Sequence, residues 1–213
     1  MSLVNVLAAI ITFFVLLIFF SFAFMYYRTF RETLFTVLQS HLIIEINDPT
    51  GDHATYVKIM RIRANHTGPA QYVHRNLSSD GSMQNFRVNG ISVTPQMDAG
   101  DRLLYVDFGR PLRRGEEREI KLEIDLFNSF PATTEWITYN IAYPTRKLTI
   151  EVKLPSTRPA FSPEIYCLSG GEKERVSTKP QLLDNGCKII WNSGDHRNLG
   201  SEYRLQWEWP RVS

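Results

Sequence analysis

The sequence has few cysteines and no cysteine pair with metal-ligand spacing. Cys167 and Cys187 are the only two among 213 residues, which excludes a dense disulfide framework. In an exported protein they could form one bridge, whereas inside a cell we expect two free, half-buried strand residues. No metal or cofactor is predicted, since there is no C-x-x-C and the histidines show no ligand spacing. The five are His41, His53, His66, His74 and His196.

Familiar catalytic and cofactor-binding motifs are also missing. There is no G-x-S-x-G elbow, P-loop, dinucleotide-binding glycine pattern, H-E-x-x-H or EF-hand spacing. Glu116 and Glu117 fall in an expected exposed turn beside several arginines, where a solvated charge cluster is a simpler interpretation than acid–base catalysis. Asp195-His196-Arg197 is likewise interpreted as a turn. We therefore predict no catalytic residues, and an enzyme with an unrecognised site is the least favoured alternative.

The chain has no excess of one charge and no basic stripe. Its formal net charge is +2, and basic residues alternate with acidic ones, as in Arg118-Glu119 and Glu172-Lys173-Glu174-Arg175. Nucleic-acid binding usually requires basic residues gathered on one face. These segments are interpreted as solvated strand faces, and no nucleic-acid partner is expected.

Charge is absent from Leu3 to Tyr27, a run dominated by Leu, Ile, Phe, Val and Ala. About 20 such residues span the ~30 Å hydrocarbon layer as a helix, so we predict one transmembrane helix near Val6 to Tyr27 and an anchor over residues 1–28. A cleaved signal peptide is less favoured, because Met1 to Asn5 lacks a basic residue and the run is long, although Ser21-Phe22-Ala23 resembles a cleavage site. A buried core helix is the third alternative.

The charges that flank this run predict its orientation. Arg28 and Arg31 follow the run and no basic residue precedes it, so the positive-inside rule places the rest of the chain in the cytoplasm. Residues 29–40 carry Phe30, Leu34 and Val37 at helical spacing, which predicts a juxtamembrane helix. The expected localisation is a single-pass membrane protein with the lipid bilayer as one partner.

Residues 41–213 read as an all-β domain. Apolar and polar residues alternate from Ile120 to Leu126, Leu148 to Leu154 and Tyr203 to Trp209, as in half-buried strands. Weaker strands are expected at His41–Ile46, Tyr56–Ala64, Tyr72–Leu77, Asn85–Val88, Leu103–Phe108, Trp136–Ala142, Ser162–Leu168 and Lys188–Trp191. No long helical pattern alternates with them, so we predict an antiparallel β-sandwich or a partly closed barrel.

Two local features refine this fold prediction. Arg110-Pro111-Leu112-Arg113-Arg114-Gly115-Glu116 resembles the "Pro-Leu-x-x-Gly-Glu" connection of immunoglobulin- and fibronectin-like sandwiches, which implies a turn before the strand that follows. Prolines between residues 155 and 163 mark a possible subdivision, although one domain with a proline-rich connection is preferred because each half alone would have a thin core.

Aromatic residues near cations provide the only ligand-binding candidates. Trp136 and Tyr139 lie close in sequence to Arg146 and Lys147, and together they could stack a base and hold its phosphates. Trp191 and Trp207 are expected in the core instead.

The favoured function is a membrane-anchored binding or sensing module, and the alternative is a structural or assembly subunit of a membrane or envelope complex. Self-association or other membrane proteins are possible partners in either case. In layout, a short hydrophobic N-terminal part followed by a β-rich domain, the chain resembles the membrane-anchored β-barrel effectors of bacterial anti-phage systems. That resemblance implies a nucleotide-responsive effector with a small nucleotide ligand. It covers architecture only, departs from the family in having one expected span instead of two, and assigns no binding residue.

Overall fold

The computed structural model describes residues 12–24, 34–74, 79–98, 101–193 and 200–211. The chain divides into two units, Met1–Leu34 and Phe35–Ser213, and each is considered by itself.

In the first unit, residues 12–24 form a helix whose side chains are exposed. Thirteen residues at 1.5 Å per residue reach about 20 Å, against the ~30 Å of a hydrocarbon layer. Among the described residues, no helix is both long enough and apolar enough to cross a membrane. The predicted single-pass localisation with a cytoplasmic β-domain is therefore wrong. That prediction also counted residues 6–11 and 25–27, which lie outside the described part of the chain.

The second unit is mainly β, as predicted. They are β1 (Phe35–Ile46), β2 (His53–Ala64), β3 (Gln71–His74), β4 (Ser82–Val88), β5 (Ile91–Ser92), β6 (Gln96–Asp98), β7 (Asp101–Asp107), β8 (Glu117–Phe127), β9 (Thr134–Asn140), β10 (Leu148–Lys153), β11 (Phe161–Ser169), β12 (Glu172–Arg175), β13 (Gln181–Leu183), β14 (Lys188–Asn192) and β15 (Glu202–Glu208), with a short 3₁₀ turn, η1 (Asp184–Gly186), before β14.

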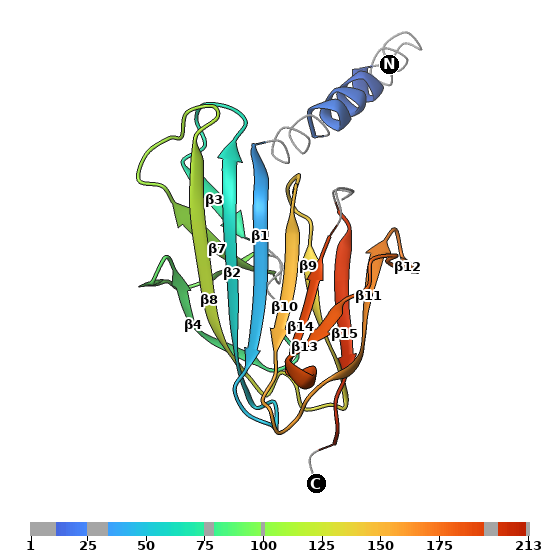
Figure 1. Cartoon of the computed structure of the whole chain (residues 1–213). Helices are drawn as coiled ribbons and strands as arrows, with labels where there is room; N and C mark the ends of the chain where they lie inside the picture. Colours follow the sequence, from blue (N-terminus) through green and yellow to red (C-terminus); the bar gives the residue numbers. More distant parts are fainter. Residues whose placement is uncertain (1–11, 25–33, 75–78, 99–100, 194–199, 212–213) are drawn as a thin grey trace. The chain divides into compact units, whose positions relative to one another are not determined.

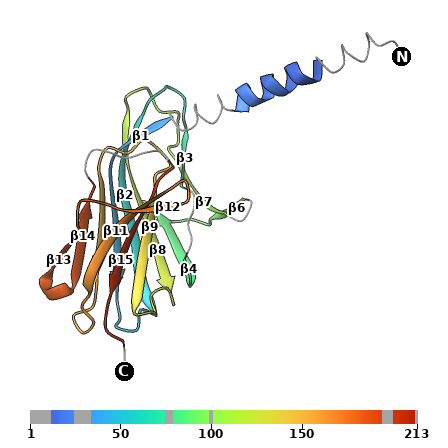
Figure 2. The same ribbon diagram turned by 90° about the vertical axis from the view of Figure 1, so that its right-hand side faces the viewer.

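These strands form three open sheets (Figures 1 and 2). The largest has the order β13-β14-β10-β1-β2-β8-β4-β5, the second β12-β11-β15-β9 and the third β3-β7-β6. Neighbouring strands run antiparallel except β1 and β10, which pair in parallel with Leu42 opposite Ile150. The expectation of purely antiparallel pairing is thus wrong at one position. The chain reaches β10 from β9 in the second sheet, so no tight hairpin imposes an antiparallel neighbour.

The second sheet packs on one face of the largest sheet around a shared apolar core. Leu42 and Ile44 of β1 are fully buried together with Trp191 of β14 and Trp207 of β15. The prediction that Trp191 and Trp207 lie in the core is confirmed. Each large apolar side chain buried in this way contributes about 1.5–3 kcal/mol to folding.

β1 begins earlier than expected and corrects the predicted juxtamembrane helix. Residues 35–40 are extended, with Phe35 and Val37 almost fully buried. Both sides of β1 are paired, to β2 along its length and to β10 from Ser40 onward. Phe35 and Val37 fit a strand period as well as a helical one, and pairing with two neighbours overrides the local pattern. Residues 29–33 lie outside the described part of the chain.

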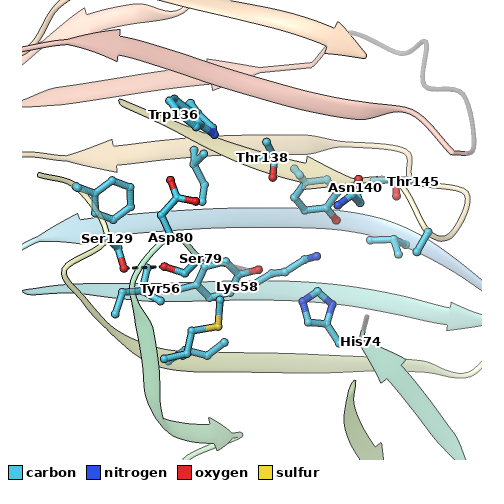
Figure 3. Close-up of a pocket in the computed structure, with 18 of the residues that line it drawn as sticks. Tyr56, Lys58, His74, Ser79, Asp80, Ser129, Trp136, Thr138, Asn140 and Thr145 are labelled. Atoms are coloured by element: carbon cyan, nitrogen blue, oxygen red, sulfur yellow. Dashed lines mark hydrogen bonds between the residues drawn. The ribbon is translucent and has the colours of Figure 1, made fainter. Parts of the chain in front are cut away.

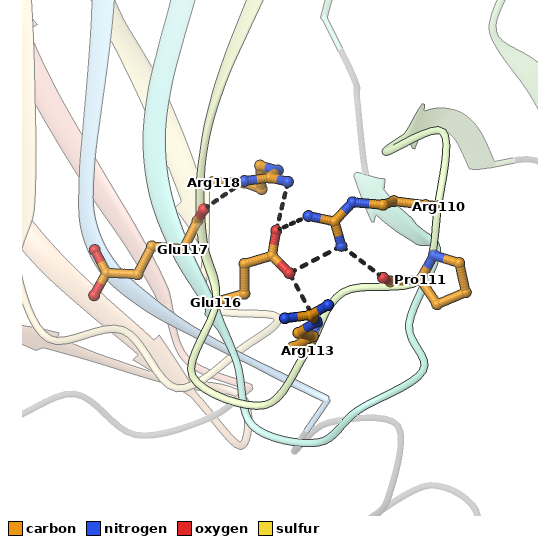
Figure 4. A network of polar contacts seen from close by, with 6 residues as sticks. All are labelled: Arg110, Pro111, Arg113, Glu116, Glu117 and Arg118. Atoms are coloured by element: carbon orange, nitrogen blue, oxygen red, sulfur yellow. Dashed lines mark hydrogen bonds and ion pairs between the residues drawn. The ribbon is translucent and has the colours of Figure 1, made fainter.

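The turn before β8 is held by Glu116 (Figure 4). Its carboxylate accepts hydrogen bonds from the Arg110 guanidinium, at 2.7 and 3.2 Å, and from the Arg113 backbone N–H at 2.9 Å, and it pairs with Arg118 at 2.5 Å. The Arg113 N–H, followed by Arg110, lowers the pKa of Glu116 below its ordinary value. Glu117 points away from this group (Figure 4). Glu116 therefore belongs to this charge cluster, while the Glu117 carboxylate pairs separately with Arg61 at 3.6 Å.

Arg158 ties three segments together at one end of the sheets. The side chain is buried, and its guanidinium donates to the carbonyl oxygens of Pro210 (2.6 Å), Pro49 (3.0 Å) and Ala132 (3.1 Å). It also lies 3.6 Å from the centroid of the Trp209 ring. The β1–β2 turn, the segment before β9 and the C-terminal segment are thus held by one side chain.

The β1–β2 turn also needs Gly51. Its φ is +79°, and a Cβ there would lie 1.9 Å from the carbonyl oxygen of Phe130. Only glycine allows this approach, which sets the β1–β2 turn against the segment that leads into β9.

Replacing Arg158 with methionine should lower the free energy of unfolding by about 3 kcal/mol, because three carbonyl groups lose their hydrogen bonds to a buried, charged donor. Urea unfolding of Arg158→Met beside Arg175→Met measures this. Arg175 is an exposed residue paired with Glu164 at 2.7 Å, so its loss should cost less than about 1 kcal/mol. Equal losses in the two variants would contradict the role given to Arg158.

Candidate functional site

Lys58 is a buried lysine on the apolar inner face of the largest sheet. Alternation along β2 directs Tyr56, Lys58 and Met60 to the same face. The register places Leu42 of β1 and Leu122 of β8 on either side of Lys58. Lysine is almost never fully buried unless it is paired, yet Lys58 is only 4% exposed.

Among the described residues, the Lys58 ammonium has no counter-ion and makes no hydrogen bond. It contacts the face of the Tyr139 ring, whose centroid lies 4.0 Å from Nζ. Burial lowers the pKa of Lys58 to about 7, because removal from water disfavours the charged form. Near neutral pH a substantial fraction of this amine is therefore uncharged.

A cavity of about 170 Å³ surrounds the Lys58 side chain (Figure 3). Its walls come from β2, β8 and β9 and from β3, and include Tyr56, Ile124, Trp136 and Tyr139. β9 is the edge strand of the second sheet and β3 is an edge strand of the third sheet. The cavity lies between these two strands and the inner face of the largest sheet.

His74, the last residue of β3, lies near Lys58 in the same cavity. It is 8% exposed and has no hydrogen-bond partner among the described residues. Burial, and then the positive charge of Lys58, hold the pKa of His74 well below its ordinary value. The imidazole is therefore neutral and keeps one nitrogen lone pair.

A second polar group lies elsewhere on the cavity wall. Ser79 and Ser129 are hydrogen-bonded at 2.7 Å, and Asp80 and Glu135 line the wall with them (Figure 3). Glu135 is 5% exposed and accepts a hydrogen bond from the Ala132 N–H at 2.5 Å. The pKa of Glu135 is raised to about 7, mainly by burial and to a smaller extent by the Asp80 charge, while that N–H and the Arg158 charge oppose the rise.

Two groups of opposite type, Lys58 and Glu135, thus change ionisation near neutral pH inside one cavity. Such perturbed groups in a concave site are typical of binding and catalytic centres. In the described part of the chain, no three His, Cys, Asp or Glu side chains gather as metal ligands do. The cavity has the character of a small organic-ligand site with apolar walls and few polar groups.

Of the four ligand-binding residues predicted from sequence, two line the cavity and two do not. Trp136 and Tyr139 both line the cavity, and Trp136 stays 41% exposed with the Arg204 guanidinium 5.7 Å from its ring centroid. Arg146 and Lys147 lie between β9 and β10, are exposed and do not line the cavity.

Sequence reasoning missed Lys58, His74 and Glu135. The one available signal was a lysine at an inward position of an alternating strand, which can be recognised only when the register is known. Cys167 in β11 and Cys187 after η1 are both partly buried and unbridged.

Comparison with known proteins identifies no family. No family model matches the sequence, and no curated protein matches it either. Similar solved structures include an M1 zinc metallopeptidase from Deinococcus radiodurans (TM-score 0.46, 14% identity, 80% of this chain and 42% of that one). Another is a putative nutrient binding protein from Legionella pneumophila (TM-score 0.43, 9% identity, 82% of this chain and 67% of that one). A third is native yeast LTA4 hydrolase (TM-score 0.44, 9% identity, 81% of this chain and 29% of that one). The chain thus spans less than half the length of these peptidase and hydrolase structures, and TM-scores this low support no argument about function.

Lys58→Met should stabilise the protein at pH 7. Lowering a lysine pKa from 10.5 to about 7 costs about 4 kcal/mol, and losing the cation–π contact removes up to about 2 kcal/mol, so a net gain of about 2 kcal/mol is expected. The unfolded chain binds the extra proton below pH 10.5. Wild-type stability should therefore rise from pH 7 towards pH 10.5, and the variant should lack this rise.

Urea unfolding of wild type and Lys58→Met at pH 7, 8.5 and 10 measures the difference directly. The exposed Lys121, which pairs with Glu123 at 3.0 Å, offers Lys121→Met as the control and should change stability little at any pH. A destabilised Lys58→Met with an unchanged pH profile would contradict the lowered pKa.

Glu135→Gln should also stabilise the protein at pH 7. The folded state keeps this carboxyl protonated up to about pH 7, while the unfolded chain ionises from about pH 4.3, so wild-type stability falls as pH rises between these values. Glutamine can still accept the Ala132 hydrogen bond. A gain of about 2 kcal/mol is expected at pH 7 and little at pH 4. The same difference at both values would argue against a raised pKa.

Proposed function

We propose that the β-unit, residues 35–213, is a binding module that holds a small organic molecule in the cavity around Lys58. The observation that carries the proposal is Lys58 itself, a buried amine that faces a cavity and has no ion-pair or hydrogen-bond partner among the described residues. Such a group lowers stability unless something in the cavity compensates for it. A ligand atom that accepts a hydrogen bond from Nζ would do so.

The size of the cavity limits the ligand. A cavity of about 150 Å³ holds one benzene molecule, and this one has about 170 Å³. One ring, or an aliphatic chain of similar size, with a short polar substituent therefore fits. Aromatic and aliphatic walls favour an apolar body, with a polar end at Lys58 and His74.

The nucleotide-responsive role stays a prediction. A base would fill this cavity, and its sugar and phosphates would have to extend beyond it. Arg146 and Lys147 are exposed and do not line the cavity. The immunoglobulin- or fibronectin-like form of the fold and the role as an assembly subunit also stay predictions.

Thermal unfolding with a panel of small probes tests the binding proposal. Benzoate and benzyl alcohol each offer an acceptor to Lys58, benzylammonium has the same ring and no acceptor, and a cyclic dinucleotide tests the nucleotide prediction. At ten times its Kd a ligand adds about 1.4 kcal/mol, which raises the Tm of a unit of this size by about 3–6 °C. Benzoate or benzyl alcohol should produce this shift, and benzylammonium should not.

Two variants locate the effect. Thr138→Trp adds bulk at the cavity wall and should abolish the shift, whereas Lys121→Met, on the opposite face of the sheet, should leave it unchanged. If no single-ring probe raises the Tm, or if Thr138→Trp responds as wild type does, the cavity is not the binding site.

A further inference from the structure

We propose that the cavity captures small aldehydes or ketones covalently, as an imine on the Lys58 amine. This inference rests on the proposed function, because the carbonyl compound would occupy the same cavity, and it names the chemical class of the ligand.

The surroundings of Lys58 favour a reactive amine over an ion-pairing one. Leu42 and Leu122 flank it on the neighbouring strands, and no described carboxylate pairs with it. A neutral amine has a free electron pair on nitrogen, and here no hydrogen bond to a described residue engages it. Burial that lowers the pKa is one established way of making a lysine nucleophilic.

A carboxylate ligand suits this position less well than a carbonyl compound does. It would need Lys58 in the charged form that burial disfavours, and it would lose its own hydration on entry. A neutral aldehyde or ketone loses far less hydration. An unprotonated imine nitrogen carries no charge. Imine formation therefore removes the free-energy cost of burying a charged ammonium at Lys58.

The reaction balances without an oxidant or reductant. The Lys58 nitrogen attacks the carbonyl carbon, and the C=O π electrons move to oxygen. Transfer of a proton from nitrogen to oxygen gives a carbinolamine. The hydroxyl then leaves as water, taking the second nitrogen-bound proton, and C=N forms, so amine and carbonyl give imine and water.

The cavity also contains groups that can move these protons. His74 is neutral and close enough for the Lys58 charge to lower its pKa, so it can accept a proton from the attacking nitrogen and return it to the hydroxyl. Glu135 is a protonated carboxyl up to about pH 7 and is a second proton donor in the same cavity. The remaining ionisable groups on the wall are Asp80 and the phenols of Tyr56, Tyr72, Tyr139 and Tyr143.

Reductive trapping tests this proposal on the full chain. Benzaldehyde is the probe, because its ring and carbonyl match the cavity in size. Sodium cyanoborohydride reduces the imine to a stable secondary amine, and peptide mapping by mass spectrometry locates each benzyl group. At pH 7 about half of the Lys58 amine is neutral, against about one in 2,500 for an ordinary lysine. Lys58 should therefore be labelled at least about tenfold faster than any exposed lysine, even with restricted access.

The pH dependence of labelling distinguishes a lowered lysine pKa from mere accessibility of the lysine to benzaldehyde. Labelling at Lys58 should level off above about pH 8, since its amine is then almost fully neutral, while labelling of exposed lysines should keep rising towards pH 10. Lys58→Met should lose the fast labelling. Lys121→Met should lose only its own slow site and keep the fast one.

The outcomes separate this inference from the proposed function. A Tm shift with benzyl alcohol or benzoate and no preferential adduct on Lys58 would overturn the imine and leave ligand binding intact. Labelling that simply follows the exposure of each lysine, together with no Tm shift from any probe, would overturn both. Fast labelling of Lys58 that levels off near pH 8 supports the imine.

Discussion

The register between β1, β2 and β8 is the constraint on which the other features depend. It places Leu42, Lys58 and Leu122 side by side on the inner face of the largest sheet. Because side chains alternate with period two, a slip of one residue would move Lys58 to the outer face and expose the core residues of β2. The same pairing therefore buries the core and keeps a lysine out of water, so the apolar face and the site have a common origin.

The unequal size of the packed sheets explains why a cavity exists beside this lysine. The second sheet has four strands and the largest has eight. The second sheet ends at its edge strand β9, which lines the cavity opposite β3 of the third sheet, and the residues before β9 are fixed by Arg158 through the Ala132 carbonyl. The Ala132 N–H in turn holds Glu135. A single buried arginine thus links the closure of one end of the sheets to the position of an ionisable group in the cavity.

Much of the fold could be predicted from local patterns, and much of the site could not. Alternation from Ile120 to Leu126 predicts β8 because the polarity of each residue indicates whether its side chain faces the core or the solvent. The parallel pairing of Ser40 with Leu148 joins residues more than a hundred positions apart, and no local pattern contains it. In sequence, Lys58 resembles an ordinary polar strand residue. Its burial becomes evident only from the register of β2 with β1 and β8. Trp136 and Tyr139 line the cavity, and as aromatic residues they stand out in the sequence without knowledge of the fold. Arg146 and Lys147 are close to them in sequence but follow the end of β9 and do not line the cavity.

The electrostatics of the cavity oppose the stability of the fold that forms it. Lys58 and Glu135 could have neutralised each other as an ion pair, yet they occupy separate parts of the wall and the pKa of Lys58 shows no effect of Glu135. Burial brings the pKa of each group to about 7, so each is about half uncharged at pH 7, and each lowers the free energy of unfolding at that pH. Hydrophobic residues of similar volume would remove both costs, as is common when a binding site is replaced by packed core. Within the described residues, Lys58 gains only its contact with the Tyr139 ring and Glu135 the hydrogen bond from Ala132, and the proposed ligand would supply the acceptor that Lys58 lacks.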